Sequence, residues 1–325
     1  MSRWKEKVDV IIPVCQPDKR FFKLLAGLAM QTVLPEKVYL LNVESGEPED
    51  SCEALQEQIY RYFNKRKSFG KRLPLAIEIV GIKPEQFDHG GTRHKGAMLS
   101  ESPYVLFMRQ NAVPSDEKLI EELLMSLQGG AGMAFARQTA ELGMNVLETY
   151  RYLEKFTSKS YVATEEMLEK KGPKAYFCSN ACAMYRKDVY MELGGFKERV
   201  IKNEDLLFAA NLLRNGGSIA YCAEAKVKMK EKCNWFDLFK LCFDNGVFYA
   251  EHPILFRNGG LSEMEFALGK KIIAYLWNQK YYVELIDFIG ESLFKATGFL
   301  LGRKHYLLPK EWKQAMSMNR NYWNR

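Results

Sequence analysis

The chain has 325 residues, of which 47% are hydrophobic and 27% charged, and these proportions are typical of a folded globular protein and exclude a disordered one. Its formal net charge of +7 is modest and accompanies no recognition motif, so nucleic acid is not expected as a partner. No signal peptide or apolar run of ~18 residues is found, and we therefore expect a cytoplasmic protein that does not span a membrane.

Along residues 1–140, short apolar runs alternate with helical patterns. The predicted strands are residues 8–14, 38–43, 75–82, 104–108 and 132–138, and the predicted helices are residues 20–31, a segment within 47–72, and 115–127. Apolar runs bounded by polar residues are typical of buried parallel strands, and their alternation with helices predicts a parallel sheet. The fold class expected is α/β, with a mostly parallel sheet flanked by helices.

Beyond residue 140 the pattern is more mixed. Residues 141–169 are predicted to be helical, 176–185 extended, 187–193 helical, 204–214 helical and 218–223 a strand. Residues 226–325 hold 16 Lys and Arg against 10 Asp and Glu and are rich in aromatic residues. This composition suits amphipathic helices lying on an anionic membrane surface, and it equally suits helices that pack on the sheet with their lysines in water.

Two polar segments are candidates for binding a phosphorylated ligand. In residues 87–95 a pair of glycines precedes Arg93, a combination that lets backbone and guanidinium approach an anion together. The alternative is a glycine turn before a solvated basic helix. The second segment begins at Arg109, directly after a predicted strand, where ligands of open α/β sheets lie. Cys178 and Cys182 have the spacing of metal ligands, but no second pair completes a zinc site.

The order of these segments resembles the family-2 glycosyltransferases with the GT-A fold, most closely their bacterial rhamnosyltransferase-like branch. The matching segments are residues 10–13, 31–32, 87–93, 110–114, 136–138, 179–181, 185–186, 194–196, 203–205, 298–302 and 308–309. The resemblance covers nearly the whole chain. It implies a catalytic domain over residues 1–225, with a donor half up to about residue 114 and an acceptor half after it, and a helical extension over residues 226–325.

The resemblance also implies a reaction. The expected enzyme is an inverting glycosyltransferase that moves a sugar from a nucleotide-sugar donor, with dTDP-rhamnose the leading candidate, to a glycan or lipid-linked glycan in surface polysaccharide synthesis. Such a transfer needs a carboxylate that removes the acceptor hydroxyl proton. Asp205 matches that position, and the neighbouring Glu204 is the second candidate. A carboxylate that only caps its helix is the structural alternative.

Further site residues follow from the same matches. Pro13 and Glu44 match positions that contact the nucleotide base and ribose, and Arg93 matches one beside the donor diphosphate. The segments expected around the donor sugar and acceptor contain Arg137, Gln138, Ser179, Asn180 and Arg186.

The chain departs from the family where a metal ion is usually bound. Arg109, Gln110 and Asn111 stand in place of an acidic metal-binding motif, and Lys228 and Lys230 in place of a histidine pair. Mg²⁺ and Mn²⁺ favour carboxylate oxygen, and an ammonium group repels them. We therefore expect no cofactor beyond the donor, with Asn111 a ligand only if a metal is bound. Arg109, Lys228 or Lys230 then neutralises the leaving diphosphate. The alternative is a degenerate GT-A protein that binds glycan or nucleotide without turnover.

Overall fold

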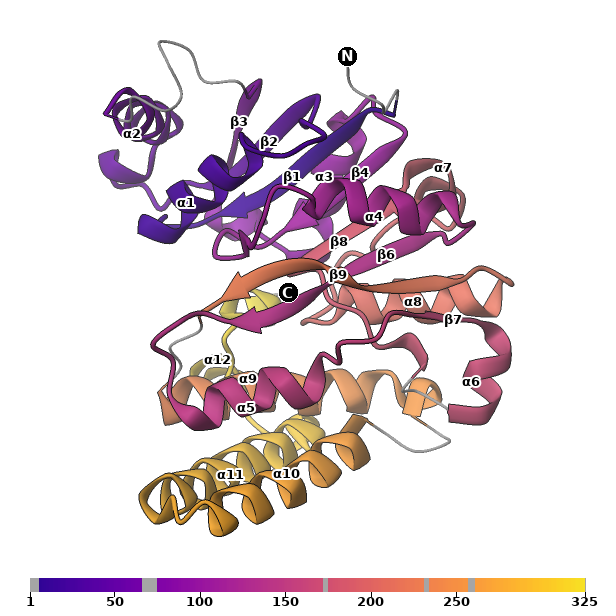
Figure 1. Cartoon of the computed structure of the whole chain (residues 1–325). Coiled ribbons are helices and arrows are strands. Elements are labelled where there is room, and N and C mark those ends of the chain that lie inside the picture. Colours follow the sequence, from indigo (N-terminus) through magenta and orange to yellow (C-terminus); the bar gives the residue numbers. More distant parts are fainter. Residues whose placement is uncertain (1–5, 66–74, 172–174, 231–233, 257–260, 325) are drawn as a thin grey trace.

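The computed structural model describes residues 6–65, 75–171, 175–230, 234–256 and 261–324. Over these residues, nine strands form one sheet in the order β3-β2-β1-β4-β8-β6-β9-β5, with β7 paired to β9 (Figure 1). The strands are β1 (Val8–Val14), β2 (Lys37–Val43), β3 (Ile77–Ile82), β4 (Tyr104–Met108), β5 (Val113–Pro114), β6 (Met133–Ala140), β7 (Tyr161–Ala163), β8 (Cys182–Arg186) and β9 (Ile219–Met229).

The first part of the sheet, β3-β2-β1-β4, is parallel as expected from its apolar runs. Beyond β4 the sheet is mixed, because β8 lies antiparallel to both β4 and β6. This refines the expectation of a mostly parallel sheet. Parallel pairing resumes between β6 and β9, interrupted by a bulge at Ala136/Arg137. The predicted helical stretch 141–169 was wrong in its middle, where β7 forms a short edge strand against β9.

Helices cover both faces of the sheet. One face packs against α1 (Lys19–Leu28), α2 (Cys52–Asn64) and α4 (Leu119–Gln128). The other packs against α3 (His89–Leu99), α7 (Lys187–Glu192), α8 (Glu204–Arg214) and α9 (Trp235–Glu251). The short 3₁₀ segments are η1 (Pro48–Asp50), η3 (Pro84–Gln86), η5 (Pro253–Phe256), η6 (His305–Leu307) and η7 (Arg320–Asn324). Each sheet face therefore has its own apolar core.

The remaining helices build a layer beside the second half of the sheet. They are α5 (Val146–Lys155), α6 (Glu165–Lys171), α10 (Leu261–Asn278), α11 (Tyr282–Arg303) and α12 (Lys310–Met316). A small core formed by Leu147, Leu276 and Leu285 joins α5 to α10 and α11. Figure 1 places α10 and α11 at the bottom of the molecule, farthest from β3 and α2.

The C-terminal helices are attached to the sheet through α9. Phe243, Val247 and Phe248 of α9 belong to the same buried core as the α8 side of the sheet. α9 and α11 cross closely, because Gly246 and Gly302 lack side chains at the contact; a Cβ on Gly302 would lie 2.0 Å from the Phe243 carbonyl oxygen. The glycines of the 298–302 segment thus set a helix crossing. Within the ranges described, no helix is both long and apolar enough to span a bilayer.

Candidate active site

The carboxyl ends of β1, β2 and β4 meet at one edge of the sheet. The Gln110 side chain joins the ends of β4 and β1, accepting a hydrogen bond from Cys15 N (2.7 Å) and donating one to Cys15 O (2.8 Å). Glu44 follows β2 and accepts from Cys52 N at 3.2 Å, and a Cβ on Gly81 would lie 2.9 Å from its carboxylate. Pro13 lies near the end of β1 in register with Leu41. The positions predicted to hold the nucleotide are therefore at neighbouring strand ends.

The glycine pair begins a helix instead of forming a turn. Asp88 caps α3 by accepting from Gly91 N at 2.7 Å, and its second oxygen accepts from Arg199 N at 3.2 Å. A side chain at Gly90 would collide with the Lys197 carbonyl oxygen, 2.6 Å from the Cβ position. The glycines thus let the first turn of α3 approach the segment before α8.

That approach creates a buried ion pair between α3 and α8. Arg93 Nη1 lies 2.8 Å from Glu204 Oε1, and each side chain is 7% exposed. Asn180 Nδ2 donates to the same Glu204 oxygen at 3.2 Å, while Tyr185 donates to Asn180 Oδ1 at 2.8 Å. Burial alone raises the pKa of Glu204, but the charge of the Arg93 guanidinium outweighs it and holds this pKa below its ordinary value. Glu204 is thus an ionised structural partner of Arg93.

Asp205, the next residue, has a different environment. Asp205 is the second residue of α8, after Glu204. The helix is preceded by Asn203, whose φ of 61° is left-handed. The Asp205 carboxylate accepts from Asn180 N and Leu206 N, both at 2.9 Å, and the residue is only half-buried. Burial and the adjacent Glu204 charge raise the pKa of Asp205 to about 6. Raised pKa values near working pH are typical of general bases.

The facing side of the site is exposed and basic. Arg109 is exposed after β4, and its backbone N–H donates to Ala181 O at 3.0 Å, close to Asn180. Lys228 is exposed on β9, opposite Val113 of β5. Lys230 directly follows β9 and is half-buried.

One arginine that the sequence reasoning missed joins these strands. Arg20 donates to the Asn111 carbonyl at 3.0 Å and the Lys228 carbonyl at 2.8 Å, and its guanidinium pairs with Glu141. Arg20 is the second residue of α1, whose N-cap is Asp18. Its sequence neighbourhood is that of any solvated arginine in the first turn of a helix. Arg20 fixes the distance between the turn after β4 and the end of β9.

The remaining predicted residues separate into two groups. Gln138 donates to Ser179 Oγ at 2.8 Å, which ties the end of β6 to the segment before β8. Arg137 precedes Gln138, and its buried Nε finds no hydrogen-bond acceptor within the described ranges. Arg186 lies apart from these, since it pairs with Tyr104 at the opposite end of β4 and forms an ion pair of 2.6 Å with Asp188.

The donor set at the usual metal position does not fit a hard cation. Asn111, Lys228 and Arg109 offer one neutral oxygen and two positive groups, whereas Mg²⁺ and Mn²⁺ prefer carboxylates. Across the described ranges no group of three or more His, Cys, Asp or Glu side chains is placed to hold a metal. No chemical step is therefore assigned to a metal ion.

His89 was not among the predicted site residues. It is the first residue of α3, and its carbonyl accepts from Arg93 Nη1 at 3.0 Å. Burial and the nearby Arg93 and Arg109 charges lower its pKa to about 4, although Glu204 acts in the opposite direction. His89 is therefore neutral at physiological pH. His89 directly precedes Gly90 and Gly91, and this position could have indicated a site residue. Only Arg93 was predicted as a site residue in this segment.

Two curated proteins are similar to the chain in sequence. No protein-family model matches the chain. The chain is 29% identical over 327 aligned residues to the O-antigen chain rhamnosyltransferase RfbN of Salmonella typhimurium, covering 98% of this chain and 96% of that protein. It is 33% identical over 251 residues to the O-antigen chain rhamnosyltransferase WbaN of Salmonella anatum, covering 76% and 79%.

Solved structures agree on the fold. The mannosyltransferase PcManGT from Pyrobaculum calidifontis, solved with GDP-Man and Mn²⁺, superposes with a TM-score of 0.55 at 14% identity, covering 99% of this chain and 86% of that one. Residues 1–349 of S. aureus TarS, solved with UDP-GlcNAc, give 0.52 at 15% identity, covering 96% and 84%. With the mixed α/β sheet, these likenesses establish the GT-A fold. The chain belongs to the family of O-antigen chain rhamnosyltransferases and is a bacterial glycosyltransferase.

Proposed function

We propose that this glycosyltransferase transfers rhamnose from dTDP-rhamnose to a growing, lipid-linked surface glycan, with inversion at the anomeric carbon. The O-antigen rhamnosyltransferase relatives support the sugar and the acceptor class. The observation that carries the catalytic part is Asp205, a half-buried carboxylate whose pKa is raised to about 6 beside a buried ion pair.

In the proposed mechanism Asp205 accepts the proton of the acceptor hydroxyl. The hydroxyl oxygen forms a bond to the anomeric carbon, while the bond from that carbon to the donor phosphate breaks and its electron pair leaves with the nucleoside diphosphate. The proton remains on Asp205 until solvent removes it. Glu204 does not compete for this role, because its charge is engaged by Arg93 at 2.8 Å and its pKa is low.

The leaving diphosphate requires positive charge. Arg93 matches the family position beside the diphosphate, but its guanidinium is already paired with Glu204. We assign the neutralising role to Arg109, Lys228 or Lys230 on the exposed side, and we propose that turnover does not depend on Mg²⁺ or Mn²⁺. A non-catalytic binding module would not need a general base, so the environment of Asp205 favours an enzyme over that alternative.

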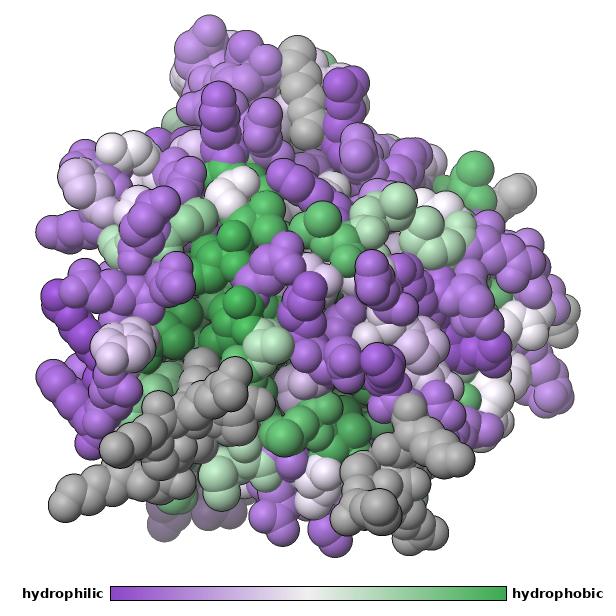
Figure 2. Space-filling view, turned by 90° about the horizontal axis from the view of Figure 1, so that it is seen from above, coloured by the Kyte–Doolittle hydropathy of each residue, from purple (hydrophilic) through white to green (hydrophobic). Residues whose placement is uncertain are grey.

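We also propose that α10 and α11 bring the enzyme to the inner face of the cell membrane. Along α11 an outward stripe of Ile286, Ile289, Leu293 and Leu300 is exposed, with Leu293 at 69%. Trp277 near the end of α10 is also exposed. Neighbouring exposed apolar residues mark interaction surfaces, and the excess of Lys and Arg over residues 226–325 suits anionic lipid. The opposite side of the molecule, seen from above in Figure 2, has hydrophobic residues at its centre and a hydrophilic rim.

The experiment that tests the function is product analysis with purified protein. The protein is incubated with a lipid-linked glycan acceptor and, separately, dTDP-rhamnose, GDP-mannose or UDP-GlcNAc. We expect release of dTDP and extension of the glycan by one rhamnose with dTDP-rhamnose alone. Transfer from another donor would replace the sugar assignment, and absence of transfer from every donor with binding intact would favour the binding module.

A further inference from the structure

The C-terminal segment, residues 317–324, returns from the helical layer to the middle of the molecule. Figure 1 shows the yellow end of the chain above α10 and α11, at the height of the lower edge of the sheet. Asp244, a buried residue of α9, anchors it by accepting from Ser317 Oγ at 2.6 Å and from Met318 N at 3.0 Å. Trp323 is 9% exposed and packs against Phe243. The segment is thus part of the folded core.

The same segment is hydrogen-bonded to both loops that introduce the site helices. Asn321 Nδ2 donates to Pro84 O at 2.6 Å, in the 3₁₀ turn that leads to α3. Asn319 Nδ2 donates to Ile201 O at 3.2 Å, just before α8. These bonds connect the Arg93 helix and the Asp205 helix through a third element more than a hundred residues away in the chain. The position of the segment is therefore coupled to the geometry of the site.

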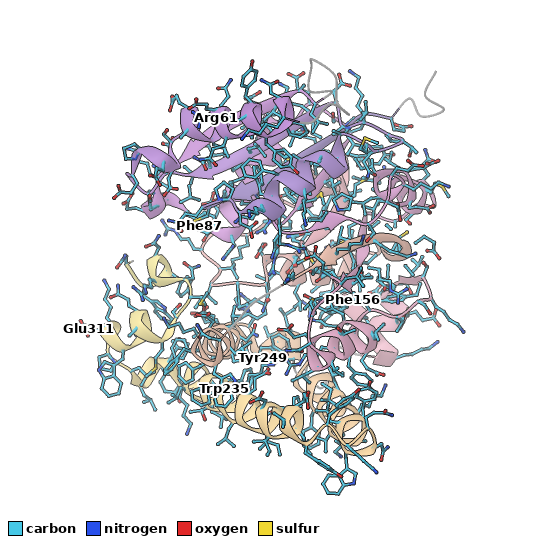
Figure 3. All side chains as sticks on the ribbon, turned by 60° about the vertical axis from the view of Figure 1, so that its left-hand side comes forward. Arg61, Phe87, Phe156, Trp235, Tyr249 and Glu311 are labelled. Carbon is cyan, nitrogen blue, oxygen red and sulfur yellow. The ribbon has the colours of Figure 1, made fainter. Side chains whose placement is uncertain are left out.

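An open surface pocket of about 180 Å³ lies where the segment meets the start of α3. It is lined by Phe87, His89, Met318, Asn319, Arg320 and Asn321. Figure 3 shows Phe87 at the edge of the first half of the sheet that faces the C-terminal helices. Among these lining residues Arg320 carries the only full charge, since the low pKa of His89 keeps its ring neutral.

Within the described ranges, Arg320 differs from Arg93 in having no acidic partner. Arg320 is exposed, and none of the described acidic side chains forms an ion pair with it. Arg93, by contrast, already shares its charge with Glu204. A guanidinium that borders a pocket beside a neutral imidazole is suited to phosphate, which it contacts through charge-assisted hydrogen bonds.

We propose that the C-terminal segment forms a wall of the active site and that Arg320 binds a phosphate group of a substrate there. The inference rests on the proposed function only for the identity of that substrate: the phosphate belongs to the nucleotide-sugar donor or to the lipid diphosphate of the acceptor. In either case the segment holds Arg320 through the contacts of Asp244, Asn319 and Asn321.

The test measures nucleoside diphosphate binding by calorimetry with the full-length protein and dTDP, UDP and GDP. Arg320→Ala should raise the dissociation constant of the tightest-binding diphosphate about tenfold or more, because a charge-assisted hydrogen bond is lost. Arg320→Lys should recover part of the loss. The exposed Lys310→Ala, at the start of α12, is the matched control and should bind as the parent does. Melting temperatures should not change for any of these variants.

The acceptor arm distinguishes the two sources of phosphate. Unchanged diphosphate binding in Arg320→Ala together with a tenfold higher KM for the lipid-linked acceptor would assign the phosphate to the acceptor and retain the wall. Parent-like diphosphate binding and parent-like acceptor KM would overturn the inference. If the parent transfers no rhamnose but Arg320→Ala still weakens diphosphate binding, the phosphate role of Arg320 stands and the proposed function is wrong. The two proposals can therefore fail separately.

Discussion

The α8 side of the site is a buried network in which Glu204 accepts hydrogen bonds from Arg93 and Asn180, whereas the β9 side presents Arg109 and Lys228 to solvent. The buried side holds its charges in fixed positions at the cost of desolvation. The exposed side has its charged groups at the surface. The difference teaches that the cationic residues predicted for one site differ in environment: Arg93 is held in a buried ion pair, whereas Arg109 and Lys228 are exposed.

The largest effect is expected at the carboxylate between these sides. Asp205→Asn should lower the transfer rate by about 10²–10⁴ while donor binding stays nearly unchanged, because the base acts on the acceptor proton. Steady-state rates and donor titration measure the two effects. Glu224→Gln, on an exposed residue of β9, is the matched control. Parent-like turnover in correctly folded Asp205→Asn would reject the assignment.

The same variant, although slower in transfer, should be more stable than the parent at alkaline pH. The pKa of Asp205 is raised to about 6 in the folded protein, so its ionisation opposes folding as pH rises through that value. Asp205→Asn should therefore melt at a higher temperature than the parent at pH 8, and the difference should diminish toward pH 4. Identical melting curves at both pH values would show that the carboxylate is not desolvated.

Breaking the buried side should affect folding more than binding. Arg93→Met leaves Glu204 buried without its partner, which should cost about 3–5 kcal/mol in the free energy of unfolding near pH 7. Because the pKa of Glu204 is depressed in the folded parent, this contribution is present above the ordinary carboxyl pKa and is lost as pH falls. The double variant Arg93→Met with Glu204→Gln should recover part of the loss. Denaturant titration that found only additive effects would contradict a direct pair.

Breaking the exposed side should affect turnover and leave stability unchanged. If the Lys228 or Lys230 ammonium contacts the diphosphate, replacing that lysine by alanine should lower the transfer rate about 10²-fold. Added Mn²⁺ should not restore the rate. Lys226→Ala, on the same strand, is the control. Rates in excess EDTA are the decisive measurement: activity that chelator abolishes and Mn²⁺ recovers would show that other residues bind a metal.

The smallest expected effect concerns the membrane surface, which lies outside both sides of the site. The parent should sediment with anionic liposomes at low salt and be released as screening increases. Ile286→Ser combined with Leu293→Ser, on the exposed stripe of α11, should reduce sedimentation without lowering transfer to a soluble acceptor. Equal recovery in the supernatant with anionic and neutral liposomes would leave the stripe to another partner, such as a second copy.

Much of the fold could be predicted locally. The apolar run of β1 and the helical spacing of α8 indicated their elements, and the GT-A assignment from motif order is confirmed. The edge strand β7 was missed because a three-residue strand has no periodicity of its own and forms only by pairing with β9. The antiparallel direction of β8 was not predicted, because it is set by pairing with β4 and β6 and not by the local sequence.

The sequence by itself determined which groups the chain offers: adjacent carboxylates Glu204 and Asp205, an arginine after paired glycines, and basic residues where the family has metal ligands. Only the tertiary structure decided their roles. Arg93 reaches Glu204 across 111 residues, and this contact makes one carboxylate an ion-pair partner while burial raises the pKa of the other. It also brought Arg320 back to the start of α3. The physical reason is that pKa and charge pairing depend on burial and distance, which local patterns do not encode.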